Sequence, residues 1–153
     1  MIKVEVLSQE KKWSKKIKKT EFFFNFICKS FPKKYRFSNK KLSLTLLLSN
    51  NKNIKKLNNK FRNKNKSTDV LSFPFYNKTE LQFKIKKNKE IYLGDIIINL
   101  DKIKFKKNKR KFQLEFNKLW IHGLVHLFGH DHKKNKDFDE MQKIEKKFLF
   151  YID

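Results

Sequence analysis

Apolar side chains recur along the chain with two periods, and the changes between these periods predict an alternation of strands and helices. Residues 2–7 alternate apolar and polar positions, which predicts a strand. Residues 43–48 form a short apolar run, as is typical of a strand covered on both faces. Residues 70–75 and 92–99 predict two more strands. Pro74 places the former at a sheet edge or a strand end, because proline has no backbone donor.

Four stretches carry apolar residues at helical spacing, and two of them lie in the N-terminal half. The first covers residues 10–30 and ends before Pro32, since the residue before a proline is disfavoured in a helix. In the second, Ser49 or Asn50 can cap a helix that gives way to a polar loop at residues 62–66.

The other two helices lie towards the C-terminus. Residues 112–128 predict one helix, and Gly129 is well placed to stop it. Residues 137–150 predict the last helix, in which Asp137 and Glu140 resemble a capping box.

Two lysine-rich stretches have weaker patterns. Residues 77–90 alternate weakly and predict a loop or an additional hairpin strand. Residues 100–111 hold seven basic residues and predict a linker or a short helix. The resulting order, β-α-β-α-β-β-α-α, predicts a single α+β domain over residues 1–153, with a small mixed sheet covered by helices.

The formal net charge of +24 suggests a polyanionic partner such as nucleic acid. However, only three of the 39 basic residues are arginines, and the chain contains no alanine. A source genome rich in A and T would produce the same bias, so we hypothesise that much of the charge is compositional. Ordinary isoelectric points among other proteins of that genome would contradict this hypothesis. The charge therefore raises the odds of RNA binding only modestly.

The remaining composition indicates a cytoplasmic protein. No apolar run approaches the length of a membrane span, and the first residues lack the apolar centre of a signal peptide. Cys28 is the only cysteine, which excludes an intrachain disulfide. It lies on the apolar face of the first predicted helix, so we expect a small buried hydrophobe rather than a reactive thiol.

All four histidines of the chain lie within residues 122–132, which indicates a metal site. His122 and His126 are four residues apart, so both imidazoles project from one face of a helix. A continued helix would carry His130 about 12 Å from His122, too far for a shared ion. A turn at Gly129 would instead bring His132 back to the metal.

Three histidines and no cysteine leave a fourth position open to water, which is typical of a catalytic zinc ion rather than a structural one. We therefore expect one Zn²⁺ held by His122, His126 and His132. Gly123 follows the first histidine where H-E-x-x-H peptidases have their glutamate base, which argues against a metallopeptidase. A glycine within a helix also indicates that another element, or the substrate, packs closely against it.

Two neighbours of the predicted ligands have open roles. His130 is either an exposed neighbour or a proton shuttle, and the former is favoured. Asp131 either orients a ligand imidazole or stabilises the turn, and the sequence does not decide between the two.

Three ordered blocks resemble the YbeY endoribonuclease family of bacterial ribosomal-RNA maturation factors. They are the motif H-G-x-x-H-L-x-G-x-D-H at residues 122–132, residues 57–62 together with 68–74, and Leu-Gly-Asp-Ile at residues 93–96. The chain departs from the family at Val125, where leucine is usual, and at His130, where tyrosine is usual.

This resemblance implies a metal-dependent endoribonuclease selective for single-stranded RNA. It implies action on the 16S rRNA precursor of the small ribosomal subunit, at its 3′ end, and a role in ribosome quality control; no DNA or membrane partner is expected. The family's zinc ligands carry over to His122, His126 and His132, and its functional arginine carries over to Arg62. An arginine fork at a zinc site suits phosphodiester chemistry, because it can hold a phosphate at two points.

Other roles stay open at the level of sequence. Asp69, Ser72 and Asp131 are candidates for the general base. Aromatic side chains at residues 73–76 can stack unpaired bases, although core packing is favoured for most of them. Two other functions compete with the nuclease: a ribosome-associated RNA-binding factor with a mainly structural metal, and the metallopeptidase that Gly123 disfavours.

Overall fold

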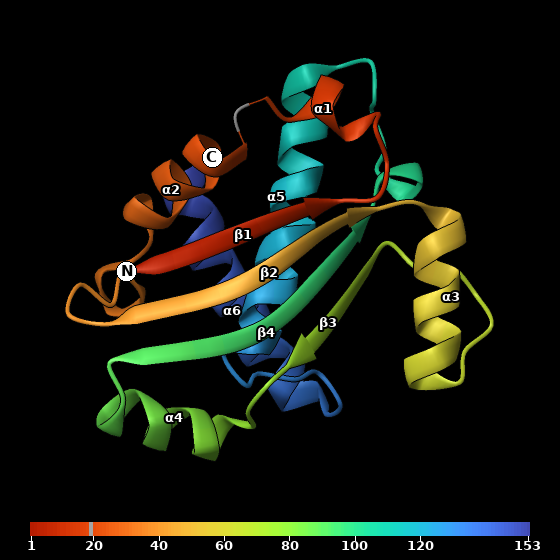
Figure 1. The fold of residues 1–153 in the computed structure, drawn as a ribbon. Coiled ribbons are helices and arrows are strands. Elements are labelled where there is room, and N and C mark those ends of the chain that lie inside the picture. The colour runs from red at the N-terminus through yellow and green to blue at the C-terminus, as the bar shows by residue number, and fades with distance from the viewer. Residues whose placement is uncertain (19) are drawn as a thin grey trace.

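A four-stranded mixed sheet forms the centre of the protein in the computed structural model, which describes residues 1–18 and 20–153 (Figure 1). The strands are β1 (Ile2–Ser8), β2 (Lys41–Ser49), β3 (Val70–Pro74) and β4 (Glu90–Asn99), in the spatial order β1-β2-β4-β3. β1 and β4 both run parallel to β2, and β3 runs antiparallel to β4. The predicted α+β class with a mixed sheet is confirmed, as is the edge position of the strand that ends at Pro74.

The helices are α1 (Trp13–Lys16), α2 (Thr20–Ser30), α3 (Asn51–Arg62), α4 (Lys78–Lys87), α5 (Lys109–Leu127) and α6 (Asn135–Ile152). Short 3-10 turns cover Lys33–Tyr35 and Leu100–Lys102. Figure 1 shows α2, α5 and α6 together on one face of the sheet, while α3 stands beside the ends of the strands. No helix within residues 1–18 and 20–153 combines the length and the apolar character that crossing a membrane requires.

Several predicted elements differ from those observed. The stretch 77–90 is mostly a helix, α4, because Asn77 and Glu80 form a reciprocal capping box that outweighs the weak strand-like alternation. The capping box predicted for the last helix is wrong, since α6 begins at Asn135 and no side chain caps it. The helix predicted over residues 10–30 is divided into α1 and α2.

The sheet is buried mainly on one face. Along β2, four alternate leucines from Leu42 to Leu48 are buried, whereas the residues between them are half-buried. The prediction that this strand is covered on both faces is therefore wrong over most of its length. Only near its end does a small cluster containing Ile54 of α3, Leu71 and Ile97 cover the second face.

Aromatic residues fill the space between the sheet and the helices on the covered face. The largest fully buried ones are Trp13, Phe24, Phe31, Phe116, Trp120 and Phe148. Cys28 is buried among them, and burial raises the pKa of its thiol to about 12. The prediction of a small buried hydrophobe at Cys28 is consistent with this environment, because the thiol stays protonated at neutral pH.

Candidate metal centre

Gly123 allows α5 to lie close against the sheet. A Cβ atom added at Gly123 would lie 2.7 Å from Cγ2 of Ile96 on β4, closer than real Cβ atoms approach a neighbour. The helix therefore packs against a strand at this point, and Ile96 fills the space that the sequence left open to either another element or the substrate. The close approach sets the position of His122, the residue just before Gly123 in the helix.

The chain turns sharply where α5 ends. Gly129 has a φ of +85°, a conformation that glycine adopts without a steric penalty. Its backbone N–H donates to the carbonyl of His126 at 2.8 Å, and that of His130 donates to the carbonyl of Val125 at 3.3 Å. A side chain at Gly129 would also meet the backbone of Lys78 at 2.6 Å. The turn therefore needs glycine for both its conformation and its packing.

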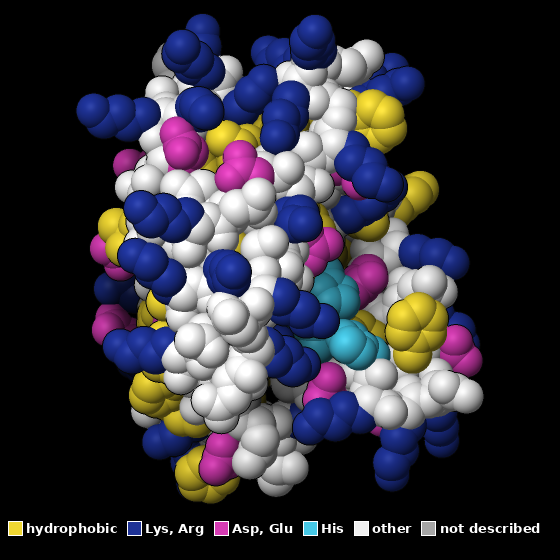
Figure 2. All heavy atoms as spheres, turned by 90° about the vertical axis from the view of Figure 1, so that its right-hand side faces the viewer, with side chains coloured by type: hydrophobic (Ala, Val, Ile, Leu, Met, Phe, Trp, Pro, Cys, Tyr) yellow, Lys and Arg dark blue, Asp and Glu magenta, His cyan; other side chains and the backbone are white. Residues whose placement is uncertain are grey.

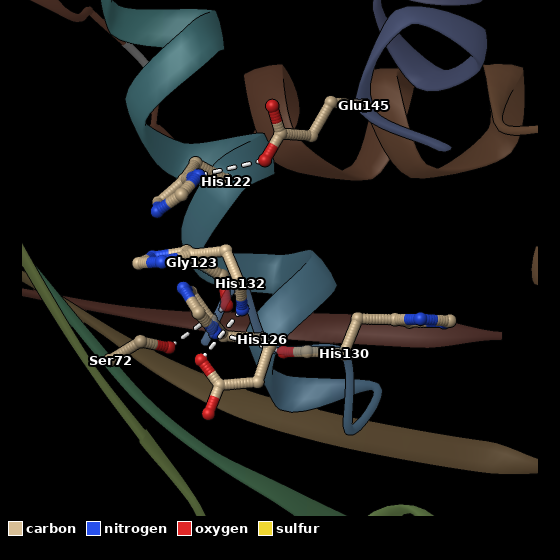
Figure 3. Close-up of polar contacts among 8 residues, drawn as sticks. Ser72, His122, Gly123, His126, His130, His132 and Glu145 are labelled. Carbon is tan, nitrogen blue, oxygen red and sulfur yellow. Dashed lines mark hydrogen bonds and ion pairs between the residues drawn. The ribbon is translucent and has the colours of Figure 1, made fainter. Parts of the chain in front are cut away.

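This turn brings the three predicted ligands together. One ring nitrogen from each of His122, His126 and His132 lies within 4.8 Å of the others. The ring centroids of His122 and His126 are 4.7 Å apart, and that of His132 lies 5.6 and 5.1 Å from them. Figure 3 shows the three rings converging while the side chain of His130 points away. The three histidines could hold a metal ion.

The other ring nitrogens of two of these histidines are already hydrogen-bonded. Nδ1 of His122 lies 2.7 Å from a carboxylate oxygen of Glu145 on α6, and Nδ1 of His126 lies 2.9 Å from the carbonyl oxygen of His130 (Figure 3). A carbonyl oxygen only accepts, so Nδ1 of His126 carries the proton and Nε2 keeps its lone pair. Metal-binding histidines are commonly oriented by partners of this kind, so the residues fit a metal ion.

The environment also keeps His126 in the form that binds metals. Burial lowers the pKa of His126, and the nearby imidazole of His122 lowers it further. Only a neutral imidazole offers a lone pair to a cation. His126 is therefore ready to coordinate a metal at neutral pH without first losing a proton.

Glu145 is the member of the site that the sequence did not reveal. It lies 23 residues beyond His122 on another helix, so no local spacing connects the two. We expect Glu145→Ala to lower zinc affinity about 10- to 100-fold, because the imidazole of His122 loses the acceptor that orients it. Competition with a chromogenic chelator measures this affinity.

Two variants make the test of Glu145 specific. Glu145→Gln keeps an oxygen acceptor at the same place and should recover most of the affinity. Lys146→Ala changes the adjacent exposed residue and should leave zinc binding unchanged. Equal zinc affinity in the Glu145→Ala variant and the wild type would show that Glu145 does not orient the ligand.

Arg62 is connected to α5 through β3. Its guanidinium donates to the carbonyl oxygen of Ser72 at 3.0 Å, and the Ser72 hydroxyl donates to the carbonyl oxygen of Gly123 at 2.9 Å. Arg62 is exposed at the end of α3, and its guanidinium carbon lies 5.5 Å from the centre of the Phe73 ring. The structure thus brings Arg62 to the strand that packs beside His122, although Arg62 is not one of the clustered metal-site residues.

The proposed general bases make mainly local hydrogen bonds. Oδ1 of Asp131 accepts from the backbone N–H of His132 at 2.8 Å, and Oδ1 of Asp69 accepts from the backbone N–H of Val70 at 2.8 Å. Both carboxylates therefore stabilise turns, and for Asp131 this favours the second of the two roles that the sequence left open. The Ser72 hydroxyl is occupied by its bond to α5.

The candidate site lies in a recess bordered by both basic and acidic side chains. Figure 2 shows histidine side chains in a hollow with lysine and arginine side chains around it and aspartate or glutamate side chains directly beside the histidines. A groove of about 470 Å³ extends from His122 between α5 and α6. Leu119 and Leu149 line its apolar part, Lys118 and Lys146 supply cations, and Asp69 and Glu145 supply carboxylates.

Known proteins resemble this chain over nearly its whole length. A protein-family model described as "Endoribonuclease YbeY" matches residues 5–153. A protein of that name from Pelagibacter ubique (strain HTCC1062) is 56% identical over 147 residues, which cover 95% of this chain and 92% of the relative. Another, from Buchnera aphidicola subsp. Acyrthosiphon pisum (strain APS), is 31% identical over 141 residues, covering 91% and 84%. The solution structure of a Thermotoga maritima protein is similar with a TM-score of 0.57 and 25% identity, covering 99% of this chain and 89% of that one.

Proposed function

This chain belongs to the YbeY endoribonuclease family, and on that premise we propose that it is a zinc-dependent endoribonuclease for single-stranded RNA. We propose that His122, His126 and His132 bind one zinc ion and act in cleavage together with Arg62. The proposed substrate is the 16S rRNA precursor at its 3′ end, on the small ribosomal subunit, with a further role in ribosome quality control. Residues 1–153 would act as one domain in the cytoplasm.

The observation that carries this proposal is the cluster of three histidines in an accessible recess. All three offered atoms are nitrogens, and the site contains no cysteine, a donor set typical of catalytic rather than structural zinc. Zinc bound there would polarise a phosphoryl oxygen or lower the pKa of a bound water. Lys118 and Lys146 beside the site would attract the RNA backbone.

The chain's own residues have separate roles in this proposal. Glu145 and the carbonyl of His130 hold two imidazoles in their coordinating orientation. Arg62 uses one N–H on the Ser72 carbonyl, which leaves further donors of its fork for a phosphate oxygen. Held in this way, the guanidinium would stabilise the charge that develops on the phosphate during cleavage.

The proposed function is tested with the purified full chain. Bound metal is measured by atomic emission, and single-stranded rRNA fragments, the matching duplexes and an unfolded protein are offered as substrates. We expect about one zinc per chain, cleavage of the single strands, and loss of cleavage with a chelator. Zinc-bound protein that binds RNA without cleaving it would instead support an RNA-binding factor with a structural metal.

Replacing Arg62 with glutamate tests its proposed contact with the phosphate. We expect cleavage to fall about 100- to 1,000-fold, as when a preorganised donor to a developing charge is removed. Zinc content should be unchanged, because Arg62 is not among the clustered nitrogens. Initial cleavage rates and metal analysis measure the two quantities.

Arg110→Glu is the matched control for Arg62→Glu. Arg110 is an exposed arginine near the start of α5, and its replacement changes the net charge by the same amount. It should reduce cleavage only slightly, through weaker long-range attraction. Equal losses in the two variants would mean that Arg62 acts through charge alone and holds no phosphate.

A further inference from the structure

The face of the sheet turned away from α5 carries a row of aromatic side chains beside the edge strand. Phe73 and Phe75 are two residues apart, so they project from the same side of the strand. The backbone N–H of Phe75 donates to the carbonyl of Leu93 at 2.9 Å, which continues the pairing with β4 beyond Pro74. Figure 1 shows that no helix of the described chain covers this part of the face between α3 and α4.

Two further rings extend this row at both ends. Phe61, from the last turn of α3, lies 5.5 Å from Phe73 between ring centroids. Tyr92 of β4 lies 5.8 Å from Phe75. We call these four residues, Phe61, Phe73, Phe75 and Tyr92, the outer aromatic row.

The row is open to solvent. The exposed fraction is 58% for Phe61 and 63% for Phe75, while Phe73 and Tyr92 are half-buried. Contiguous exposed apolar surface is uncommon in soluble proteins and commonly marks a binding surface. Phe61 and Phe75 are therefore available to a ligand, while Phe73 also packs against the small cluster of Ile54, Leu71 and Ile97.

Two rings of the row, and the ring of the neighbouring Tyr76, are each paired with a cation. Nζ of Lys60 lies 5.3 Å from the centre of the Phe61 ring, and the guanidinium carbon of Arg62 lies 5.5 Å from that of Phe73. Beyond Phe75, Nζ of Lys84 lies 5.7 Å from the Tyr76 ring. Rings paired with cations suit single-stranded RNA, because bases stack on the rings and phosphates meet the cations.

Three acidic side chains, Asp95, Glu80 and Glu5 of β1, lie near the row. Burial raises the pKa of Tyr92, and the charges of Asp95 and Glu5 raise it further. Asp95 and Glu80 are engaged in hydrogen bonds. Oδ1 of Asp95 accepts from the Tyr92 hydroxyl at 2.5 Å. Glu80 accepts from the backbone N–H of Asn77 in the capping box of α4. Lys60, Arg62 and Lys84 nevertheless lie over rings, so stacking surfaces and phosphate-binding groups occur side by side, which favours RNA over a protein partner with a purely apolar patch.

Strand β3 joins the row to the candidate metal centre. Phe73 follows Ser72, whose hydroxyl is bonded to the carbonyl of Gly123 beside His122. Arg62 lies at the junction, with its guanidinium over the Phe73 ring and bonded to the Ser72 carbonyl. An RNA strand whose phosphate is held by Arg62 can therefore continue around the sheet edge onto the aromatic row.

We propose that the outer aromatic row is a stacking site for the unpaired bases that flank the cleaved phosphate. This inference rests on the proposed nuclease function and names the part of the chain that selects unpaired RNA. A duplex keeps its bases stacked on one another and offers none to the rings, so only a single strand gains this binding energy.

The double variant Phe61→Ala/Phe75→Ala tests the site, because both side chains are exposed and their loss leaves the core intact. With single-stranded RNA of about 12 nucleotides, we expect KM to rise at least about 25-fold in the double variant, because the binding energy of the bases stacked on the two rings is lost. The value of kcat and the zinc content should stay the same. The fluorescence of 2-aminopurine placed beside the cleavage site should be quenched on binding to the wild type and not to the variant.

Phe22→Ala/Phe26→Ala is the matched control. These two phenylalanines are 71% and 64% exposed on α2, which packs against β1 at the opposite edge of the sheet. Their removal should leave KM unchanged. A substrate of about three nucleotides, too short to reach from the metal centre along the row, should give the same KM with every variant.

The outcomes separate this inference from the function on which it rests. Absence of RNA cleavage by the zinc-loaded wild type would contradict the proposed function. Cleavage by the wild type with an equal KM in the two double variants would overturn the stacking site alone. Normal RNA kinetics in Phe61→Ala/Phe75→Ala combined with loss of a protein partner would assign the row to protein binding instead.

Discussion

His126→Ala is expected to abolish zinc binding and to reduce RNA cleavage to the background rate. His126 lies between the other two clustered histidines in sequence. Its removal leaves only two of the three ligands, which is not enough for a stable zinc site. Zinc at 100 times its dissociation constant should stabilise the wild type by about 2.7 kcal/mol. This corresponds to a rise in Tm of roughly 5–10 °C for a chain of this size. The variant should show no such rise, which calorimetry with and without zinc measures.

His130→Ala is the control, because it removes a histidine from the same segment. The side chain of His130 points away from the cluster, and its contribution to the site is a backbone carbonyl that alanine retains (Figure 3). Zinc binding, the zinc-dependent rise in Tm and cleavage should all persist. A zinc-dependent Tm in His126→Ala, or its loss in His130→Ala, would mean that the ligands have been assigned wrongly.

Gly94→Ala is expected to destabilise the fold by roughly 3 kcal/mol or more, the largest loss expected for alanine at any of the three glycines of the chain. Gly94 has a φ of +132°, which side chains strongly disfavour, and an added Cβ would lie 2.1 Å from the carbonyl oxygen of Phe73. Because that atom belongs to the backbone, β3 would have to move. Urea unfolding monitored by circular dichroism measures the loss.

A shift of β3 would also disturb the site. β3 carries Ser72, which links Arg62 to α5, so Gly94→Ala should lower cleavage even where the protein is still folded. Ser43→Ala on the neighbouring strand is the control, and its cost should be below about 1 kcal/mol, as for most partly exposed positions. An unfolding midpoint for Gly94→Ala equal to that of Ser43→Ala would contradict the steric argument.

Local sequence patterns predicted most helices and strands. They failed where the hydrophobic pattern and the capping residues indicated different structures. The weak alternation in residues 77–90 indicated a loop or strand, whereas Asn77 and Glu80 started a helix there. The reverse happened at the last helix, where Asp137 and Glu140 had suitable spacing but the helix began earlier, at Asn135. Side-chain capping contributes only a small part of the stability of a helix, so the spacing of possible capping residues does not by itself locate a helix end.

Burial was predicted less well than element type. The leucine-rich strand β2 suggested cover on both faces, yet α2, α5 and α6 all lie on one side of the sheet (Figure 1). An apolar run indicates how much of its surface a strand tends to bury. It does not indicate how many helices cover each face of the sheet, because that depends on the lengths and directions of the connections between elements. The open face that results is the one that carries the outer aromatic row.

Local features of the sequence account for half of the metal centre. The four-residue spacing of His122 and His126 places them on one helix face, and Gly129 supplies the turn that returns His132. These features depend only on the helical period and on the φ angles open to glycine, both of which are properties of a few consecutive residues.

Which residues lie opposite them depends on the tertiary structure. It placed Glu145 of α6 against His122, Ile96 against Gly123, and Arg62 against Ser72. Each of these pairs joins residues from different elements, so its distance is set by how α3, α5, α6 and the sheet pack together. No spacing along the chain encodes such a distance, because the packing of the whole core determines it.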